Sequence, residues 1–177
     1  MVSSGANGGG IKGGRVRLGG RISPPRPQPN QIPEPPAASK KRVLFVCIGN
    51  SCRSPMAESI ALRDSYEIFE CTSAGLSPLG VVQKQTLDTL QRNGYPVTNL
   101  SSKAISGEER NATDLVINMS GHPKQRAFPR SDWDKVEDWD VEDPYGGDPV
   151  VYQRIFEDIR TRIESLTARL RDTAGNE

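Results

Sequence analysis

A cysteine and an arginine six positions apart are the residues of this sequence best suited to chemistry. Cys47 and Arg53 lie in the stretch "VCIGNSCRSP", between an apolar run and Pro55. Arginine presents a planar, permanently charged fork that can bind two oxygens of an oxyanion such as a phosphoryl group. A cysteine thiolate beneath that group is a nucleophile aimed at phosphorus. The pair therefore indicates phosphoryl-transfer chemistry.

The residues around this pair predict a loop that binds an anion. "RVLFVC" predicts a short buried parallel strand over 42–47, and Ser54 and Pro55 suit the N-cap and first turn of a helix over 54–65. Ligands of open parallel sheets bind beyond the carboxyl ends of the strands, where loop amides and a helix N-terminus favour negative charge. We expect these charges and Arg53 to favour the Cys47 thiolate, with the Ser54 hydroxyl donating to the sulfur. This chemistry requires no metal and no cofactor.

Each of these residues also has an ordinary structural role. A lone cysteine at a strand end is usually a small core residue, and a lone arginine is usually a solvated surface charge. The combination of Cys47 and Arg53 with Gly49 and a helix start in the predicted place favours the site. The loop lacks the G-x-x-x-x-G-K-[ST] pattern of nucleotide-binding phosphate loops.

The rest of the body of the chain alternates strands and helices. Further strands are expected over 66–75 ("YEIFECTSAG"), 114–119 ("DLVINM") and 135–139, and helices over 81–94, 106–112 and from Asp148 and Pro149 onward. This alternation predicts one three-layer α/β domain over 41–177, with a four-stranded parallel sheet and helices on both faces.

The first 40 residues differ in composition from the rest. They hold half of the 14 prolines, and six of the 23 basic residues but only one of the 22 acidic residues. With so few large apolar side chains, residues 1–40 are predicted to be a disordered Gly/Pro/Arg-rich tail. The body is mildly acidic and gives no nucleic-acid footprint, while weak contacts of the basic tail with partners stay open.

The cysteine content and hydropathy suggest a compartment. Three cysteines in 177 residues do not form a disulfide framework, which points to a reducing, cytoplasmic environment. No run of about 18 apolar residues occurs, so no membrane span is expected.

Four motifs together resemble the low-molecular-weight protein tyrosine phosphatase family. "VCIGNSCRSPMAES" is similar to its C-x-x-x-x-x-R-[ST] signature, and "TSAG" at 72–75, "DLVINM" at 114–119 and "DPYGG" at 143–147 follow in the family's order. The resemblance spans roughly residues 41–171. It implies a cysteine-dependent phosphatase that acts on a phosphorylated protein or peptide through a cysteinyl-phosphate intermediate.

The resemblance also implies a role for each site residue. Cys47 is the implied nucleophile, Arg53 binds the phosphoryl group, Ser54 stabilises the thiolate, Asn50 shapes the loop, and Asp143 is the general acid. The implied phosphate-binding loop comprises Ile48, Gly49, Asn50, Ser51, Cys52, Arg53 and Ser54.

The loop departs from tyrosine-selective members at the predicted substrate walls. Ser51 stands where those members have a large aliphatic residue, and Tyr145 is followed by Gly146 rather than by a second aromatic residue. Both features resemble the phosphoarginine-specific branch of the family, whose small hydroxyl residue would admit a planar guanidinium. Phosphotyrosine is favoured by the family as a whole and phosphoarginine by these residues.

Two other functions remain as alternatives. Arsenate reductases that share this fold have a very similar loop, but they need a further cysteine pair downstream, and no cysteine follows Cys71 here. An anion-binding module without turnover would lack the nucleophile, the arginine or the acid, and all three are present. The resemblance implies that Cys52 forms a reversible disulfide with Cys47 under oxidation, as the family's second loop cysteine does, and packing under the loop is the alternative role of Cys52. Cys71, inside an apolar strand, is expected to be inert.

Overall fold

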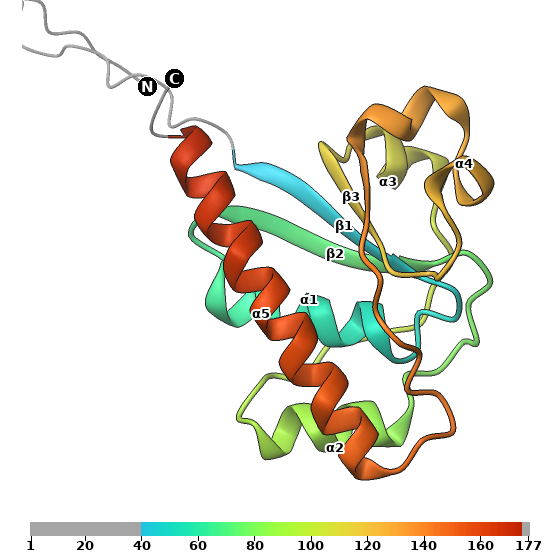
Figure 1. Cartoon of the computed structure of the whole chain (residues 1–177), viewed down its shortest axis with the longest axis vertical. Helices are drawn as coiled ribbons and strands as arrows, with labels where there is room; N and C mark the ends of the chain where they lie inside the picture. The colour runs from blue at the N-terminus through green and yellow to red at the C-terminus, as the bar shows by residue number, and fades with distance from the viewer. Residues whose placement is uncertain (1–39, 175–177) are drawn as a thin grey trace, which may run out of the picture. The chain divides into compact units, whose positions relative to one another are not determined.

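The centre of the molecule is a sheet of four parallel strands in the order β2-β1-β3-β4, of which Figure 1 labels the first three. The computed structural model describes residues 40–174, so all of the predicted tail except Lys40 lies outside the described residues. The strands are β1 (Lys41–Cys47), β2 (Phe69–Gly75), β3 (Leu115–Asn118) and β4 (Val136–Asp138). All four predicted strands are present, and the predicted parallel sheet is confirmed.

The strand register places the ends of β1 and β2 side by side. Cys47, the last residue of β1, pairs with Gly75, the last residue of β2. On the other side of β1, Val46 pairs with Asn118 at the end of β3. The loops that leave these strands therefore emerge at the same edge of the sheet, which is where parallel α/β sheets bind ligands.

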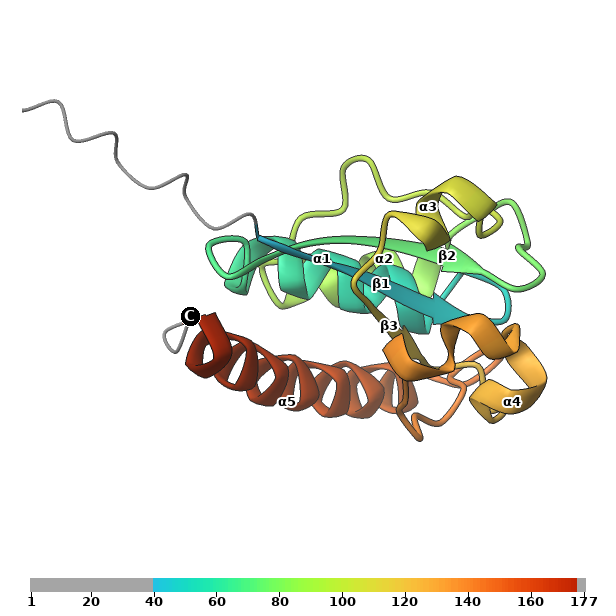
Figure 2. The same cartoon turned by 90° about the horizontal axis from the view of Figure 1, so that it is seen from above.

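Helices cover both faces of the sheet, as predicted. The helices are α1 (Arg53–Asp64), α2 (Lys84–Arg92), α3 (Gly107–Asn111), α4 (Lys124–Ala127), the 3-10 helix η1 (Arg130–Lys135) and α5 (Pro149–Ala174). Helix α5 runs alongside α1, and Figure 2 shows this pair from above. The alternation of side chains along β1 accounts for the layers: Val43 and Phe45 pack with α1 and α5, whereas Leu44 and Val46 pack with Phe128 on the opposite face.

Some predicted boundaries were wrong because local backbone hydrogen bonds prevailed over the apolar pattern. The second strand begins at Phe69 rather than at residue 66, because the N–H groups of Ile68 and Phe69 both donate to the Ser65 carbonyl in a turn. Helix α2 begins at Lys84 rather than at residue 81, since the Gln83 N–H donates to Ser51 of the cysteine loop. Helices α4 and η1 were not predicted, because they are short and have no regular apolar spacing.

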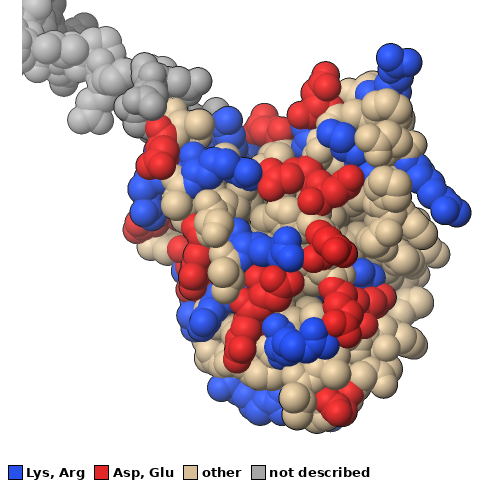
Figure 3. All heavy atoms as spheres, in the orientation of Figure 1, with Lys and Arg blue, Asp and Glu red and all other residues tan. Residues whose placement is uncertain are grey.

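Helix α5 is held at both its start and its outer face. The Asp148 carboxylate accepts hydrogen bonds from the N–H groups of Val150 and Val151 and so caps the helix that was predicted to begin here. Basic and acidic side chains are interspersed over the face that carries α5 (Figure 3). Two ion pairs connect α5 to other segments, Arg154 with Glu142 and Arg169 with Glu137, and Arg162 pairs with Asp158 within the helix. Within residues 40–174, no helix is long and apolar enough to cross a membrane.

Ile159 provides a test of the α5 interface. Its side chain is fully buried in the core between α5, α1 and the sheet. Ile159→Ala should lower the free energy of unfolding by about 2–5 kcal/mol, because it removes buried methyl groups and leaves a cavity. Chemical denaturation measures this loss. Glu164→Ala, on the exposed side of the same helix, is the matched control, and an equal loss in both variants would contradict the assigned packing.

Candidate active site

The cysteine loop runs from Cys47, at the end of β1, to Arg53, the first residue of α1. Four of its carbonyl groups accept hydrogen bonds from the segment 76–83 that follows β2. The pairs are Leu76 N to Cys47 O, Ser77 N to Ile48 O, Leu79 N to Gly49 O and Gln83 N to Ser51 O. Since C=O and N–H point in opposite directions across a trans peptide, these bonds turn the N–H groups of the following residues toward the inside of the loop. The loop therefore presents donors to an anion.

Gly75 permits the close approach of β2 to this loop. A Cβ atom at Gly75 would lie 2.8 Å from the carbonyl oxygen of Ile48, which is closer than side-chain carbons approach backbone oxygens. The glycine of the "TSAG" motif is therefore required by the distance between backbones rather than by an unusual φ angle.

Asn50 sets the shape of the loop from within. Its φ of 44° lies in the left-handed region, which asparagine adopts more readily than most residues. Its side-chain amide donates to Ser54 Oγ at 2.9 Å and to Ser73 Oγ at 2.9 Å, and its Oδ1 accepts from the Lys103 N–H at 2.8 Å. The fully buried Asn50 thus joins the loop to β2 and to the segment before α3.

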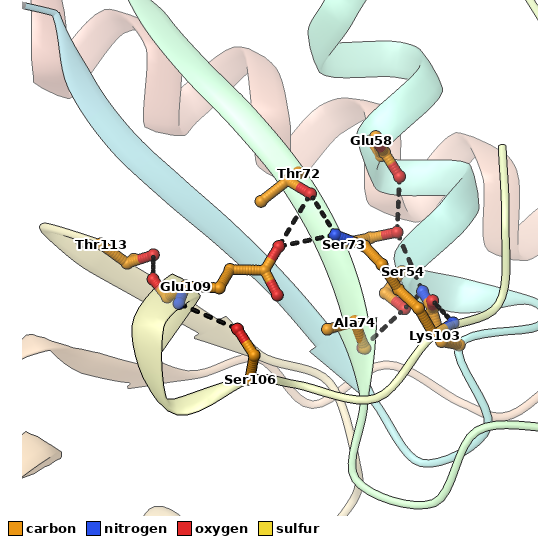
Figure 4. A network of polar contacts seen from close by, with 10 residues as sticks. Ser54, Glu58, Thr72, Ser73, Ala74, Lys103, Ser106, Glu109 and Thr113 are labelled. Atoms are coloured by element: carbon orange, nitrogen blue, oxygen red, sulfur yellow. Dashed lines mark hydrogen bonds and ion pairs between the residues drawn. The ribbon is translucent and has the colours of Figure 1, made fainter. Parts of the chain in front are cut away.

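Ser54 contacts the sulfur of Cys47, as the sequence predicts. Its Oγ lies 3.1 Å from Cys47 Sγ. Because Asn50 already donates to this oxygen, the single hydroxyl proton of Ser54 is free to point at the sulfur. Figure 4 shows Ser54 beside β2, where the carbonyl of Ala74 is a more distant acceptor at 3.4 Å.

The prediction that Ser54 caps the helix was wrong. Helix α1 begins one residue earlier, at Arg53, and Cys52 occupies the N-cap position without a side-chain capping bond. The Ser54 hydroxyl is engaged with Asn50 and Cys47 instead, so it cannot also satisfy the first N–H groups of the helix.

The charged side chain of Arg53 is buried. The residue is 4% exposed, and its Nη2 donates to Asp143 Oδ2 at 2.7 Å while Nη1 donates to the Val141 carbonyl at 3.3 Å. Its buried Nε has no hydrogen-bond partner among residues 40–174. A buried, unpaired N–H on a cation costs free energy unless an acceptor binds it, so this donor fits an oxyanion beside the loop.

The loop closes one side of a pocket of about 260 Å³. Its lining residues are Cys47, Ile48, Gly49, Ser51, Cys52, Arg53, Leu79, Asp143 and Tyr145. Every residue that the sequence identified as catalytic or as a substrate wall therefore lies around one cavity, although Cys47 and Asp143 are far apart in the chain. Asn50 and Ser54 lie behind the loop and support it.

Asp143 and Tyr145 come from the turn that precedes α5. The Asp143 carboxylate is about half exposed and also accepts from the Tyr145 N–H at 3.2 Å, which fixes it within the turn. The Tyr145 side chain is 60% exposed, so it stands at the mouth of the pocket. The neighbouring Glu142 is bound through both carboxylate oxygens to Arg154, and this pair ties the turn to α5.

Leu79 is a pocket residue that the sequence reasoning missed. A lone leucine in the stretch "LSPLGVV" carries no chemical signal that would mark it as a pocket residue. Leu79 is 52% exposed and packs over Gly49, where an added Cβ would lie 3.1 Å from Leu79 Cγ. Together with Ile48 and Tyr145 it gives the pocket apolar walls. The bond from Leu79 N to the loop carbonyl was not visible in the sequence.

The other two cysteines are held as thiols. Burial raises the pKa of the Cys52 thiol, whose Sγ lies 3.4 Å from the Tyr152 hydroxyl. Burial, with the nearby Glu58 charge second, raises the pKa of Cys71 to about 12. Cys47, Cys52 and Cys71 are all free of disulfides in this structure. The disulfide hypothesis for Cys47 and Cys52 remains a prediction.

Fold and loop together define the class of cysteine-based phosphatases built on a parallel α/β sheet. Residues 42–175 match the family model for low molecular weight phosphotyrosine protein phosphatase, and the chain belongs to this family.

Proteins similar to this chain include a tyrosine phosphatase, an arginine phosphatase and an arsenate reductase. The low molecular weight protein tyrosine phosphatase from T. tengcongensis is 30% identical, with a TM-score of 0.68 over 73% of this chain and 99% of that one. The YwlE arginine phosphatase from Geobacillus stearothermophilus is 26% identical, with a TM-score of 0.70 over 77% and 97% of the two chains. Arsenate reductase 2 from Staphylococcus haemolyticus is 31% identical over 130 residues, which are 73% of this chain and 98% of the relative.

The thiol environments predict the order in which the cysteines react. With limiting iodoacetamide near pH 7.5, Cys47 should be alkylated first, because the pKa of both Cys52 and Cys71 is raised and only the thiolate reacts. Tandem mass spectrometry localises the label, since Cys47 and Cys52 share one tryptic peptide. Cys47→Ser should remain almost unlabelled, and rapid labelling of Cys52 or Cys71 in this variant would contradict the assignment.

Proposed function

We propose that the protein hydrolyses phosphotyrosine in proteins or peptides through a cysteinyl-phosphate intermediate. The observation that carries the proposal is the pocket itself, in which Cys47, Arg53 and Asp143 meet beneath apolar walls from Ile48, Leu79 and Tyr145. A phosphate fits the donors at the base of such a pocket, and a flat phenyl ring gains from burial between apolar side chains.

In the first step, Cys47 Sγ attacks phosphorus while the bond from phosphorus to the tyrosine oxygen breaks. Asp143 gives a proton to that leaving oxygen, so the dephosphorylated tyrosine side chain of the substrate and cysteinyl-phosphate result. Arg53 and the loop N–H groups stabilise the charge on the transferring phosphoryl oxygens. A phosphoryl group at Arg53 competes with Asp143 for Nη2, which releases the carboxyl group toward the leaving oxygen.

In the second step, water attacks the phosphorus of the intermediate and the bond to sulfur breaks. Asp143, now ionised, takes a proton from the attacking water, and inorganic phosphate leaves. The Cys47 sulfur departs as a thiolate, which the Ser54 hydroxyl at 3.1 Å stabilises. Both steps balance without an electron donor.

One observation favours phosphoarginine as a second candidate substrate. Ser51 is almost fully buried in the pocket lining, and its hydroxyl donates to the Val81 carbonyl at 2.6 Å. With its proton committed, the Ser51 oxygen can only accept further hydrogen bonds, and a guanidinium offers several N–H donors whereas a phenyl ring offers none. This geometry supports a role for Ser51 in substrate choice.

Arsenate reduction is less well supported by the residues of this chain. The reaction requires two electrons, which thiols can supply only by forming a disulfide. No cysteine follows Cys71, and the raised pKa of Cys52 and Cys71 makes both poor nucleophiles. Hydrolysis needs only Cys47, Arg53 and Asp143.

Substitution of the nucleophile and of the acid tests the chemistry. Cys47→Ser should abolish hydrolysis of p-nitrophenyl phosphate, and Asp143→Asn should lower kcat by about 10²–10⁴-fold because the leaving group loses its proton donor. The measurement is release of inorganic phosphate. Full activity in Cys47→Ser would overturn the proposal. Glu164→Gln, which removes an exposed carboxylate of α5 that does not line the pocket, is the control and should keep kcat.

Matched peptides decide between the two substrates. The wild-type kcat/KM for a phosphotyrosine peptide should exceed that for a phosphoarginine peptide of the same sequence by more than about tenfold, or about 1.4 kcal/mol of transition-state binding. Ser51→Ile fills the small position with a branched aliphatic side chain and should widen this preference. The opposite ranking in the wild type, reversed by Ser51→Ile, would establish phosphoarginine as the substrate instead.

A further inference from the structure

A continuous chain of hydrogen bonds connects Cys47 to a carboxylate on the far side of the loop. It runs from Cys47 Sγ to Ser54, then to Asn50, to Ser73 on β2, and ends at Glu58 on α1. Figure 4 shows the bond from Ser73 to Glu58 beside β2. Glu58 is not among the residues that line the pocket.

The carboxylate fixes the direction of every bond in this chain. An ionised carboxylate can only accept, so Ser73 must give its single proton to Glu58 Oε2, at 2.5 Å. The Ser73 oxygen then serves as the acceptor for Asn50 Nδ2. The second Nδ2 proton of Asn50 goes to Ser54, whose own proton is directed at Cys47.

A second anchor holds the amide of Asn50 from the opposite side. The Lys103 N–H donates to Asn50 Oδ1, so the amide cannot flip and present its oxygen to the two serines. The Lys103 ammonium donates to Thr72 Oγ1 at 3.1 Å and to Glu109 Oε1 at 2.7 Å, which secures this backbone against β2 and α3. Lys103 is thus the cation shared by Glu109 and, at longer range, by Glu58.

Glu58 is placed where its charge is costly. Burial raises the pKa of its carboxyl group, opposed by the hydrogen bond from Ser73 and by the charge of Lys103. A group whose folded-state pKa is raised binds protons more readily when folded, so its ionised form lowers stability as pH rises through the folded pKa. A residue kept at a cost to stability is expected to serve another purpose.

We propose that Glu58 is a positioning residue for the Cys47 thiolate, acting through Ser73, Asn50 and Ser54. It keeps the hydroxyl proton of Ser54 on the sulfur by accepting at the far end of the chain. This role rests on the proposed phosphatase function, but it concerns the state of the sulfur and can be measured without any phosphorylated substrate.

Two substitutions at Glu58 separate the acceptor from its charge. Glu58→Ala removes the acceptor and should lower kcat/KM for p-nitrophenyl phosphate by about tenfold, the size of one lost hydrogen bond. It should also shift the pH of half-maximal Cys47 alkylation by iodoacetamide upward, because less thiolate forms. Glu58→Gln keeps an oxygen that accepts from Ser73 and should stay within about twofold of wild type.

Ser59→Ala is the control for a merely structural effect on α1. Its hydroxyl donates to the Pro96 carbonyl and takes no part in the hydrogen bonds that connect Glu58 to Cys47. This variant should lower the melting temperature and leave the alkylation profile unchanged. If Glu58→Ala behaves in the same way, Glu58 serves packing alone and the proposal is overturned.

Ser73→Ala decides the case in which Glu58→Ala does not fold. This variant removes the hydroxyl that connects Glu58 to Asn50. It should give the same upward shift in the pH of half-maximal alkylation. An unchanged profile in Ser73→Ala overturns the proposal. A wild-type protein that never turns over phosphate, yet shows these shifts, would overturn the proposed function and leave the positioning role of Glu58 standing.

Discussion

The burial of the Arg53 guanidinium is the constraint on which the site depends. A cation at 4% exposure must be surrounded by acceptors, and the protein supplies Asp143 and the Val141 carbonyl from the turn before α5. The same requirement brings that turn over the cysteine loop. Arg53 therefore assembles the pocket as well as presenting an unpaired Nε to an anion. Because the buried guanidinium keeps one unpaired N–H, an oxyanion that accepts from it lowers the free energy of the site, which favours oxyanions as ligands.

The support of the loop is divided between its backbone and its side chains. Carbonyl groups of the loop are bound by the segment 76–83, and these bonds orient the N–H donors. Side chains behind the loop then orient protons, from Glu58 through Ser73 and Asn50 to Ser54. The first set orients the backbone donors of the pocket and the second orients the hydroxyl proton of Ser54, so together they decide which atoms the pocket offers.

The predictions from the sequence were correct for elements whose hydrophobic pattern alone specifies their structure and burial. The apolar run before Cys47 and the regular apolar spacing in α5 specify elements whose burial is decided by periodicity, and both formed as predicted. The predictions failed where one polar side chain could form either of two sets of hydrogen bonds. Ser54 carries the residue type of a helix cap, but its hydroxyl is used by Asn50 and Cys47. Leu79 carries no chemical signal and became a wall through a backbone bond to Gly49.

The parallel α/β architecture and the loop with its cysteine, arginine and distant aspartate were predictable from the amino-acid sequence. These follow from residue types and spacings along the chain, which carry periodicity and chemistry directly. Three contacts became visible only in the folded protein: Asp143 binds Arg53, Leu79 lines the pocket, and Glu58 ends the series of hydrogen bonds that begins at Cys47. Such contacts join segments distant in sequence, and their partners are selected by the geometry of packed strands and helices.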